Sequence, residues 1–238
     1  MEQLKTAIVN YGRGIYAIDQ QMVRAFLIVG SKSALLLDTG AVCVDIKKYI
    51  EQITGLPVTV ILTHGDADHT GNLMAYNTAY CNENDHAAVL SHESGKDVRL
   101  LSLSEGDAFD IGGRVLKTLL TPGHTAGSVC LLDEENGILF AGDTVSYGPV
   151  FMFGAGRSMT DYLESLRRLE KLSIDGVFKT VYCCHGACPI PADAVEELKS
   201  CAEGVLNHTI SGVPAPMPGP ADDKPLLCKY GKCMLLVD

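Results

Sequence analysis

The sequence lacks any run of 18 apolar residues, so it contains no candidate for a membrane-spanning helix. Its N-terminus, MEQLKTAIVN, lacks the basic stretch and following apolar stretch of a secretory signal. Basic residues are few, because 19 Lys and Arg stand against 29 Asp and Glu, giving a formal net charge of −10. Nucleic acids and anionic membranes both bind basic surfaces. We therefore expect a cytoplasmic protein that binds a small-molecule substrate, with neither a nucleic acid nor a membrane as its partner.

A disulfide framework is also not expected. The nine cysteines are odd in number and spread over 238 residues, whereas disulfide scaffolds are usually short secreted domains. The segment CCHGAC (Cys183, Cys184 and Cys188) has no second paired element at the spacing of a structural zinc site. We predict reduced thiols.

The sequence shows no repeats and no low-complexity segment, and 47% of its residues are hydrophobic, enough for a substantial core. We predict a single domain over residues 1–238. Short β-rich runs and helical periodicities alternate along the chain, which is typical of a mixed α/β protein. Strands are expected at 14–19, 24–30, 33–40, 58–63, 78–82, 113–124, 127–143 (a hairpin turning at 135–137), 178–186 and 225–238 (a hairpin turning at Gly231). Helices are expected at 44–54, 71–77, 84–93, 158–172 and 191–207, and an ordered Pro-rich loop at 212–225.

Residues that can bind metal follow four of these strands. His64, Asp66, Asp68 and His69 lie in ILTHGDADHTGN, directly after a continuous apolar strand; His124, Asp143 and His185 each follow another strand. Strand ends are rigid supports from which such side chains can converge at one edge of a sheet. The coincidence of four strand ends is stronger evidence for a metal site than any single histidine. By contrast, His86 and His92 are six residues apart on an expected helix and are predicted to be surface residues.

The ordered blocks LLLDTG, ILTHGDADHTGN, LLTPGHTAGSV, LFAGDTV and CCHG make the chain resemble the metallo-β-lactamase-fold superfamily. The signature of that family is His-x-His-x-Asp-His, followed by a distant His, Asp and His. The resemblance runs from about Ile15 to Gly186. It implies an α/β fold, a four-layer αββα sandwich of two mixed β-sheets flanked by helices, with the site at one edge of the sheets.

The resemblance also implies a site for two divalent metal ions. His64 and His124 would bind the first ion, whereas Asp68, His69 and His185 would bind the second, with Asp143 bridging both. Asp38 in LLLDTG would hydrogen-bond a ligand histidine or a loop amide, or would simply form a turn. Zinc is the first expectation for the metal.

Asp66 departs from the family signature, which has histidine at this position. A carboxylate can bind zinc, but an oxygen-richer site also favours iron or manganese. Flavodiiron proteins likewise have an acid here, although this chain has no flavodoxin-like domain. Three alternatives stay open for Asp66: it binds the first ion, it leaves the first site weak, or it accepts a hydrogen bond from a metal-bound water.

The expected activity is that of a metal-dependent hydrolase. A hydroxide bridging the two ions would attack a small ester, thioester, lactone or related substrate, and Asp68 would orient it or accept its proton. The alternatives are an iron-dependent oxidoreductase and a degenerate, non-catalytic member of the family. Substrate contacts are expected from loops at the site, with Arg157 either gripping a substrate carboxylate or pairing near a helix start, and Phe151 and Phe153 either lining a pocket or packing in the core. The predicted substrate-binding residues are Arg24, Tyr147, Phe151, Phe153 and Arg157. The sequence does not indicate an oligomeric state.

Overall fold

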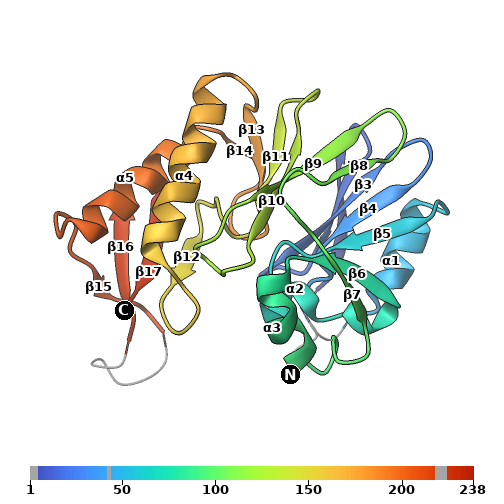
Figure 1. The fold of residues 1–238 in the computed structure, drawn as a ribbon, viewed down its shortest axis with the longest axis horizontal. Helices are drawn as coiled ribbons and strands as arrows, with labels where there is room; N and C mark the ends of the chain where they lie inside the picture. The colour runs from blue at the N-terminus through green and yellow to red at the C-terminus, as the bar shows by residue number, and fades with distance from the viewer. Residues whose placement is uncertain (1–4, 42–43, 218–223) are drawn as a thin grey trace. The chain divides into compact units, whose positions relative to one another are not determined.

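The computed structural model describes residues 5–41, 44–217 and 224–238, and the chain divides into two compact units, Met1–Leu119 and Leu120–Asp238. Each unit is a mixed β-structure with flanking helices (Figure 1). This confirms the predicted α/β class, while the single-domain organisation stays a prediction. Within the described residues, no helix is both long and apolar enough to cross a membrane.

The first unit contains a seven-stranded sheet whose strands follow one another in chain order. Neighbouring strands pair antiparallel from β1 to β4 and parallel from β4 to β7. Leu37 of β4 lies opposite Ile61 of β5, so the segments after both strands leave the same edge of the sheet. The strands are β1 (Ala7–Gly12), β2 (Ile15–Asp19), β3 (Arg24–Val29), β4 (Ala34–Leu37), β5 (Val58–Ile61), β6 (Thr78–Cys81) and β7 (Arg99–Ser102).

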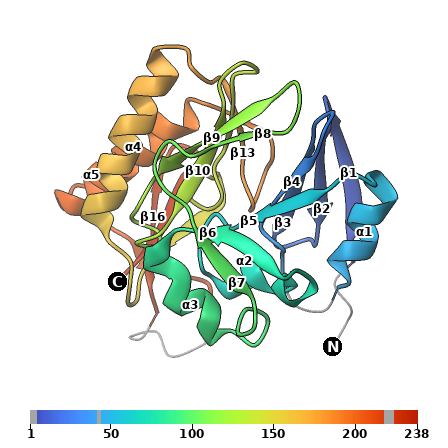
Figure 2. The ribbon, with the colours of Figure 1, turned by 45° about the vertical axis from the view of Figure 1, so that its right-hand side comes forward.

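Helix α1 (Ile46–Ile53) packs against this sheet. Its Ile46 and Ile50 share a face and enter the core cluster with Leu36 and Val60. Figure 2 shows α1 beside the strands of this unit. Strand β4 is a continuous apolar run because it is buried on both faces, whereas in β5 only Val60 and Ile61 are buried. The other elements of this unit are α2 (Ala67–Thr70), the 3₁₀ turns η1 (Leu73–Ala75) and η2 (Glu83–Asp85), α3 (His86–Ser91), and the hairpin of β8 (Ala108–Asp110) with β9 (Val115–Leu120).

The second unit contains two groups of strands. In one group β10 pairs antiparallel with β11, β11 pairs parallel with β13, and β13 pairs antiparallel with β14. In the other group the order is β12, β17, β16, β15. The strands are β10 (Val129–Asp133), β11 (Ile138–Phe140), β12 (Pro149–Met152), β13 (Thr180–Tyr182), β14 (Ile190–Pro191), β15 (Val213–Pro214), β16 (Leu226–Tyr230) and β17 (Cys233–Val237).

Two helices, α4 (Met159–Ile174) and α5 (Ala194–Leu206), lie side by side in this unit (Figures 1 and 2). Ser158 caps α4 by accepting a hydrogen bond from the Asp161 amide. The buried face of α4 carries Tyr162, Leu163, Ser165, Leu166 and Leu169. Lys199 of α5 and Glu170 of α4, both partly buried, pair at 2.7 Å.

The structure differs from the predicted elements in several places. Strands β7, β8 and β14 and the short helix α2 were not predicted, and the helix predicted at 71–77 is the 3₁₀ turn η1. β1 was not predicted, because it is largely exposed and therefore has no apolar pattern to mark it. Residues 149–152, for which no strand was predicted, form strand β12, which pairs parallel with β17. The Pro-rich stretch 212–225 contains the short strand β15, and its residues 218–223 lie outside the described part of the chain.

Replacing Leu36, which is completely buried in the first unit, tests the core. Leu36→Ala should lower the free energy of unfolding by about 2–5 kcal/mol, because it leaves a cavity in a closely packed site. Ile8→Ala, on the exposed β1, is the control and should cost less than about 1 kcal/mol. Urea unfolding of both variants measures this, and equal losses would contradict the assigned core.

Candidate metal centre

In the first unit, four ligand-type side chains lie within the six residues 64–69, shortly after β5. The Nε2 atom of His64 lies 3.5 Å from an Asp66 carboxylate oxygen, and that of His69 lies 3.8 Å from an Asp68 carboxylate oxygen. The two imidazole rings have centroids 4.0 Å apart. His64 and His69 are buried, whereas the side chains of Asp66 and Asp68 are 31% and 46% exposed. The loop therefore presents two histidine–carboxylate pairs side by side.

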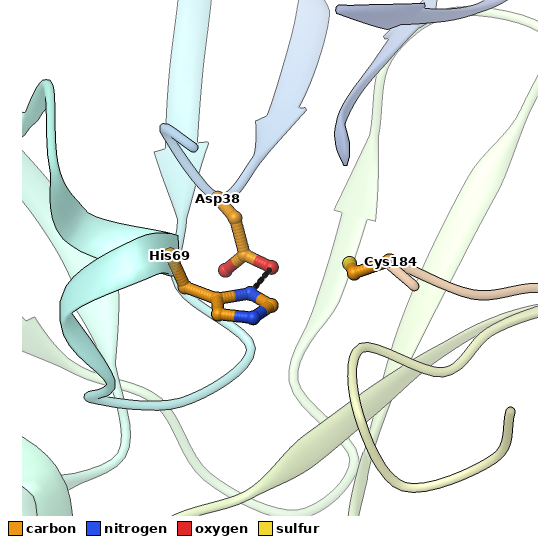
Figure 3. A group of neighbouring side chains, drawn as sticks. All are labelled: Asp38, His69 and Cys184. Atoms are coloured by element: carbon orange, nitrogen blue, oxygen red, sulfur yellow. Dashed lines mark hydrogen bonds and ion pairs between the residues drawn. The ribbon is translucent and has the colours of Figure 1, made fainter. Parts of the chain in front are cut away.

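Asp38, at the end of β4, lies beneath this loop and is completely buried. One carboxylate oxygen accepts a hydrogen bond from the Thr63 amide at 2.7 Å, and the other lies 2.8 Å from Nδ1 of His69 (Figure 3). The prediction that Asp38 bonds a histidine or a loop amide is confirmed for both groups. Since an ionised carboxylate only accepts, Nδ1 of His69 carries the proton and Nε2 keeps its lone pair.

The same carboxylate also determines the protonation of His64. The Thr63 hydroxyl donates to Asp38 at 2.8 Å and lies 3.0 Å from Nδ1 of His64. Because its proton points at Asp38, the hydroxyl accepts from His64 Nδ1–H. The Nε2 lone pair of His64 is therefore also available to a metal ion.

The peptide groups of Gly65 are held by two side chains that the sequence did not single out for this role. The Gly65 amide donates to Asp85 at 2.8 Å, and its carbonyl lies 3.0 Å from Nε2 of His92. His86 similarly bonds the Cys81 carbonyl. His86 and His92, predicted to be surface residues, are partly exposed and each is hydrogen-bonded to a main-chain carbonyl. Asp85 and His92 lie 20 and 27 residues from Gly65, and no local pattern marks such pairs.

In the second unit, Asp143 and His185 are neighbours because of strand register. Phe140 of β11 lies opposite Tyr182 of β13 in a parallel pair, and each ligand follows three residues later. Nε2 of His185 lies 3.2 Å from the Oδ2 atom of Asp143. The same Oδ2 atom lies 3.8 Å from Nε2 of His124. One carboxylate thus faces two imidazoles.

His124 is fixed by the segment that follows β11. Its Nδ1 atom lies 2.9 Å from the Phe151 carbonyl, which can only accept, so Nε2 again keeps the lone pair. Arg157 donates from Nη1 to the main-chain carbonyl of His124 at 2.5 Å. Of the two roles predicted for Arg157, the observed contact favours pairing near the start of α4.

Helix α4 holds both ligand loops of this unit. The Tyr162 hydroxyl donates to the carbonyl of Thr144, next to Asp143, and Ser165 donates to the carbonyl of Pro122, close to His124. Burial raises the pKa of Tyr162 well above its usual value, which keeps its proton in place for this bond. A Cβ atom on Gly123, whose φ is +141°, would collide with the Tyr162 backbone, so the approach requires glycine.

The donor sets of both units suit a divalent metal ion. Two atoms bound about 2.0–2.1 Å from a tetrahedral ion lie about 3.3 Å apart. The four nitrogen–oxygen separations are 3.2–3.8 Å, so each pair of atoms can serve one ion. The Nδ1 contacts of His64, His69 and His124 are the outer hydrogen bonds that metal-binding histidines usually make. The residues therefore fit a divalent metal.

The predicted substrate-binding residues have different surroundings. Arg24 pairs with Asp19 at 2.8 Å in the first unit, between the second and third strands. Tyr147 donates to Asp193, and Lys232 lies 5.3 Å from its ring centroid. Phe151 is 40% exposed, which excludes the alternative that it packs in the core. The rings of Phe151 and Phe153 are 5.5 Å apart.

Several cysteines are inert by environment. Burial raises the pKa of Cys130 to about 11 and that of Cys201 to about 12, so neither is a thiolate at neutral pH. Burial also raises the pKa of Cys81 and Cys233. These thiols belong to the core.

Comparison with known proteins agrees with this arrangement. A family model described as "Metallo-beta-lactamase superfamily" matches residues 18–178. The chain is 27% identical over 213 residues to an acyl-coenzyme A thioesterase, MBLAC2, of Gallus gallus, covering 71% of this chain and 76% of the relative. It is also 30% identical over 178 residues to the lactamase-like protein aptB of Emericella nidulans, covering 70% of this chain. It spans about half the length of this fungal relative, 52%.

Solved structures match over most of the chain. A metallo-beta-lactamase from Pontibacter korlensis aligns with a TM-score of 0.69 at 18% identity, covering 84% of this chain and 99% of that one. A metallo-beta-lactamase family protein from Thermus thermophilus aligns with a TM-score of 0.63 at 23% identity, covering 87% and 82%. At these identities the likeness establishes the fold.

Replacing Asp38 tests the outer hydrogen bonds. Asp38→Asn should weaken zinc binding about 10- to 100-fold, because an amide cannot accept all three hydrogen bonds and disturbs the tautomers of His64 and His69. Competition with a chromogenic chelator measures the affinity. Asp97→Asn, on the exposed surface, is the matched control. Unchanged affinity in Asp38→Asn would contradict the role given to this carboxylate.

Replacing Arg157 separates its two predicted roles. Arg157→Met should weaken metal binding about tenfold and slow all substrates alike, because it releases the main chain of His124. Arg167→Met is the control, since Arg167 pairs with Glu164 and Glu203 on the exposed side of α4. A rise in KM confined to substrates with a carboxylate, at unchanged metal affinity, would instead assign Arg157 to substrate binding.

Proposed function

The chain belongs to the metallo-β-lactamase superfamily, and we propose that it is a metal-dependent hydrolase. One observation carries the proposal: three imidazoles have Nδ1 engaged in an outer hydrogen bond while Nε2 faces a carboxylate oxygen. Buried histidines that only support a core have no need of a carboxylate facing Nε2 as well as a partner at Nδ1. A shared cation accounts for the arrangement.

We propose that these residues hold two divalent ions, by the ligand pattern of the family. His64, Asp66 and His124 are assigned to the first ion, and Asp68, His69 and His185 to the second, with Asp143 shared. The carboxylate of Asp143, which lies near two imidazoles, supports its shared assignment. Bound divalent ions supply Lewis acidity and lower the pKa of water.

The carboxylates have separate tasks in this proposal. Asp68 is nearly half exposed, so its second oxygen can orient an attacking water and accept its proton. The Asp66 carboxylate lies 3.5 Å from Nε2 of His64, closer than Asp68 lies to His69. Of the three alternatives for Asp66, this distance supports direct binding of the first ion. Asp38 keeps the imidazoles oriented through its contacts with His69 and with the Thr63 hydroxyl.

The substrate class we propose is a small acyl thioester or ester. The support is the name of the Gallus gallus relative, an acyl-coenzyme A thioesterase that the chain covers over most of its length. Zinc is the proposed metal. The oxygen donors of Asp66, Asp68 and Asp143 also suit iron or manganese, so metal identity is part of the test.

Removal of metal tests the function. The purified protein should hydrolyse acyl thioesters and esters, and dialysis against a chelator should abolish at least about 99% of the activity, because the residues alone lack a strong nucleophile. Adding back zinc, manganese or iron separately should identify the ion that restores turnover. Asp68→Asn should lower kcat about 100-fold or more, as expected for loss of a proton acceptor.

The controls separate the competing functions. Elemental analysis under anaerobic conditions should find close to two divalent ions per chain. Stoichiometric iron with a redox-active spectrum would favour an oxidoreductase, and less than one ion with no chelator-sensitive turnover would favour a non-catalytic protein. Either result would overturn the proposal.

A further inference from the structure

A pair of aromatic side chains in the second unit, the exposed Phe151 and the partly buried Phe153, has no role in the chemistry described so far. On β12 the side chains alternate, so Val150 and Met152 are buried while Phe151 is 40% exposed. The ring of Phe151 lies 5.5 Å from that of Phe153, with an interplanar angle of 36°. Together the two rings form an apolar surface on the outer side of the strand.

This surface begins at a proposed metal ligand. The carbonyl of Phe151 accepts the hydrogen bond from Nδ1 of His124, and Nε2 of the same imidazole faces Asp143. The residue that orients His124 through its main chain therefore also carries an exposed ring. A substrate whose reacting carbonyl lies beside His124 would bring its neighbouring groups to this ring.

The surface is held rigidly before any substrate binds. Phe151 lies opposite Leu236 in the parallel pairing of β12 with β17. The strand is followed by Gly154, whose amide donates to the carboxylate of Asp238, and by Arg157, which donates to His124. A rigid surface costs little entropy to order on binding, which favours a binding role.

The composition of residues 144–156, which include both rings, favours an apolar ligand group. In a protein of net charge −10, residues 144–156 contain no Asp, Glu, Lys or Arg. The segment itself therefore offers burial of apolar surface, and the charged groups that contact it lie at Gly154 (Asp238) and at Tyr147 (Lys232). The part of the substrate that lies here is therefore expected to be uncharged and apolar.

We infer that Phe151 and Phe153 form the subsite for the apolar acyl chain of the substrate. The inference rests on the proposed hydrolase function and makes its substrate more specific: a thioester or ester of an acyl group longer than acetyl. The acyl chain lies on the two rings while its carbonyl lies beside the metal ligands.

The subsite makes kcat/KM depend on the length of the acyl chain of the substrate. Burying one methylene of the acyl chain completely should raise kcat/KM about fourfold. A surface that covers only one side of the acyl chain should raise kcat/KM about twofold per methylene. For wild-type protein in its metal-loaded form, kcat/KM should rise from the acetyl to the butanoyl, hexanoyl and octanoyl thioesters of one small thiol.

Two variants test the subsite independently. Phe151→Ala keeps the main-chain carbonyl that bonds His124, and Phe153→Ala removes the second ring. In each variant the ratio of octanoyl to acetyl kcat/KM should fall at least about fivefold. Ile174→Ala, at the far end of α4 and 77% exposed, is the control and should keep the wild-type ratio. Metal content and thermal unfolding, measured for every variant, identify any loss of fold.

The outcomes distinguish the two proposals. A wild-type profile that does not rise with chain length, or a ratio unchanged in both correctly folded phenylalanine variants, would overturn the subsite and leave the hydrolase function standing. No turnover of any ester or thioester by the metal-loaded protein would overturn the hydrolase function and the subsite with it. A ratio that falls in both variants and not in the control supports the subsite.

Discussion

The buried carboxylate of Asp38 is the constraint on which the metal loop of the first unit depends. It has no exposure to water, and its backbone has a φ of +62°, a left-handed conformation that aspartate tolerates better than most residues. A buried charge is stable only when it is hydrogen-bonded. Its bonds to the Thr63 amide, the Thr63 hydroxyl and His69 satisfy it and at the same time fix two imidazoles. The requirement to solvate one charge thus determines the tautomers of two proposed ligands.

Parallel strands supply the frame for both halves of the ligand set. Asp38 and His64 follow the parallel pair of β4 and β5, whereas Asp143 and His185 follow the parallel pair of β11 and β13. The carboxyl ends of parallel strands meet at one edge, where loops can carry polar groups without disturbing the core. In the second unit α4 then fixes the loops, because its buried Tyr162 and Ser165 each donate to a loop carbonyl. Hydrogen bonds to the buried Asp38 carboxylate therefore hold the ligand loop of the first unit, whereas helix α4 holds the ligand loops of the second.

Much of this arrangement could be predicted from the sequence. The apolar strands, the capped helix at Ser158 and the ligand-type residues after four strands are all encoded by local patterns. The hydrogen bonds of Gly65 to Asp85 and His92 and of Arg157 to His124 could not be predicted, because they join residues 20 to 33 positions apart with no local signature. β1 was missed because an exposed strand has no buried face and therefore no alternation. The exposure of Phe151 depends on the register of β12 against β17, which composition does not encode.

The central claim is that outer hydrogen bonds leave Nε2 of the ligand histidines free to bind a metal ion. Nitrogen-15 NMR of the histidine side chains, recorded on chelator-treated protein and then during addition of zinc, tests it most directly. The account predicts that His64, His69 and His124 carry the proton on Nδ1 without metal, and that their Nε2 resonances shift when zinc is added. Protonation of Nε2 in His69 or His124, with resonances that zinc does not change, would contradict it.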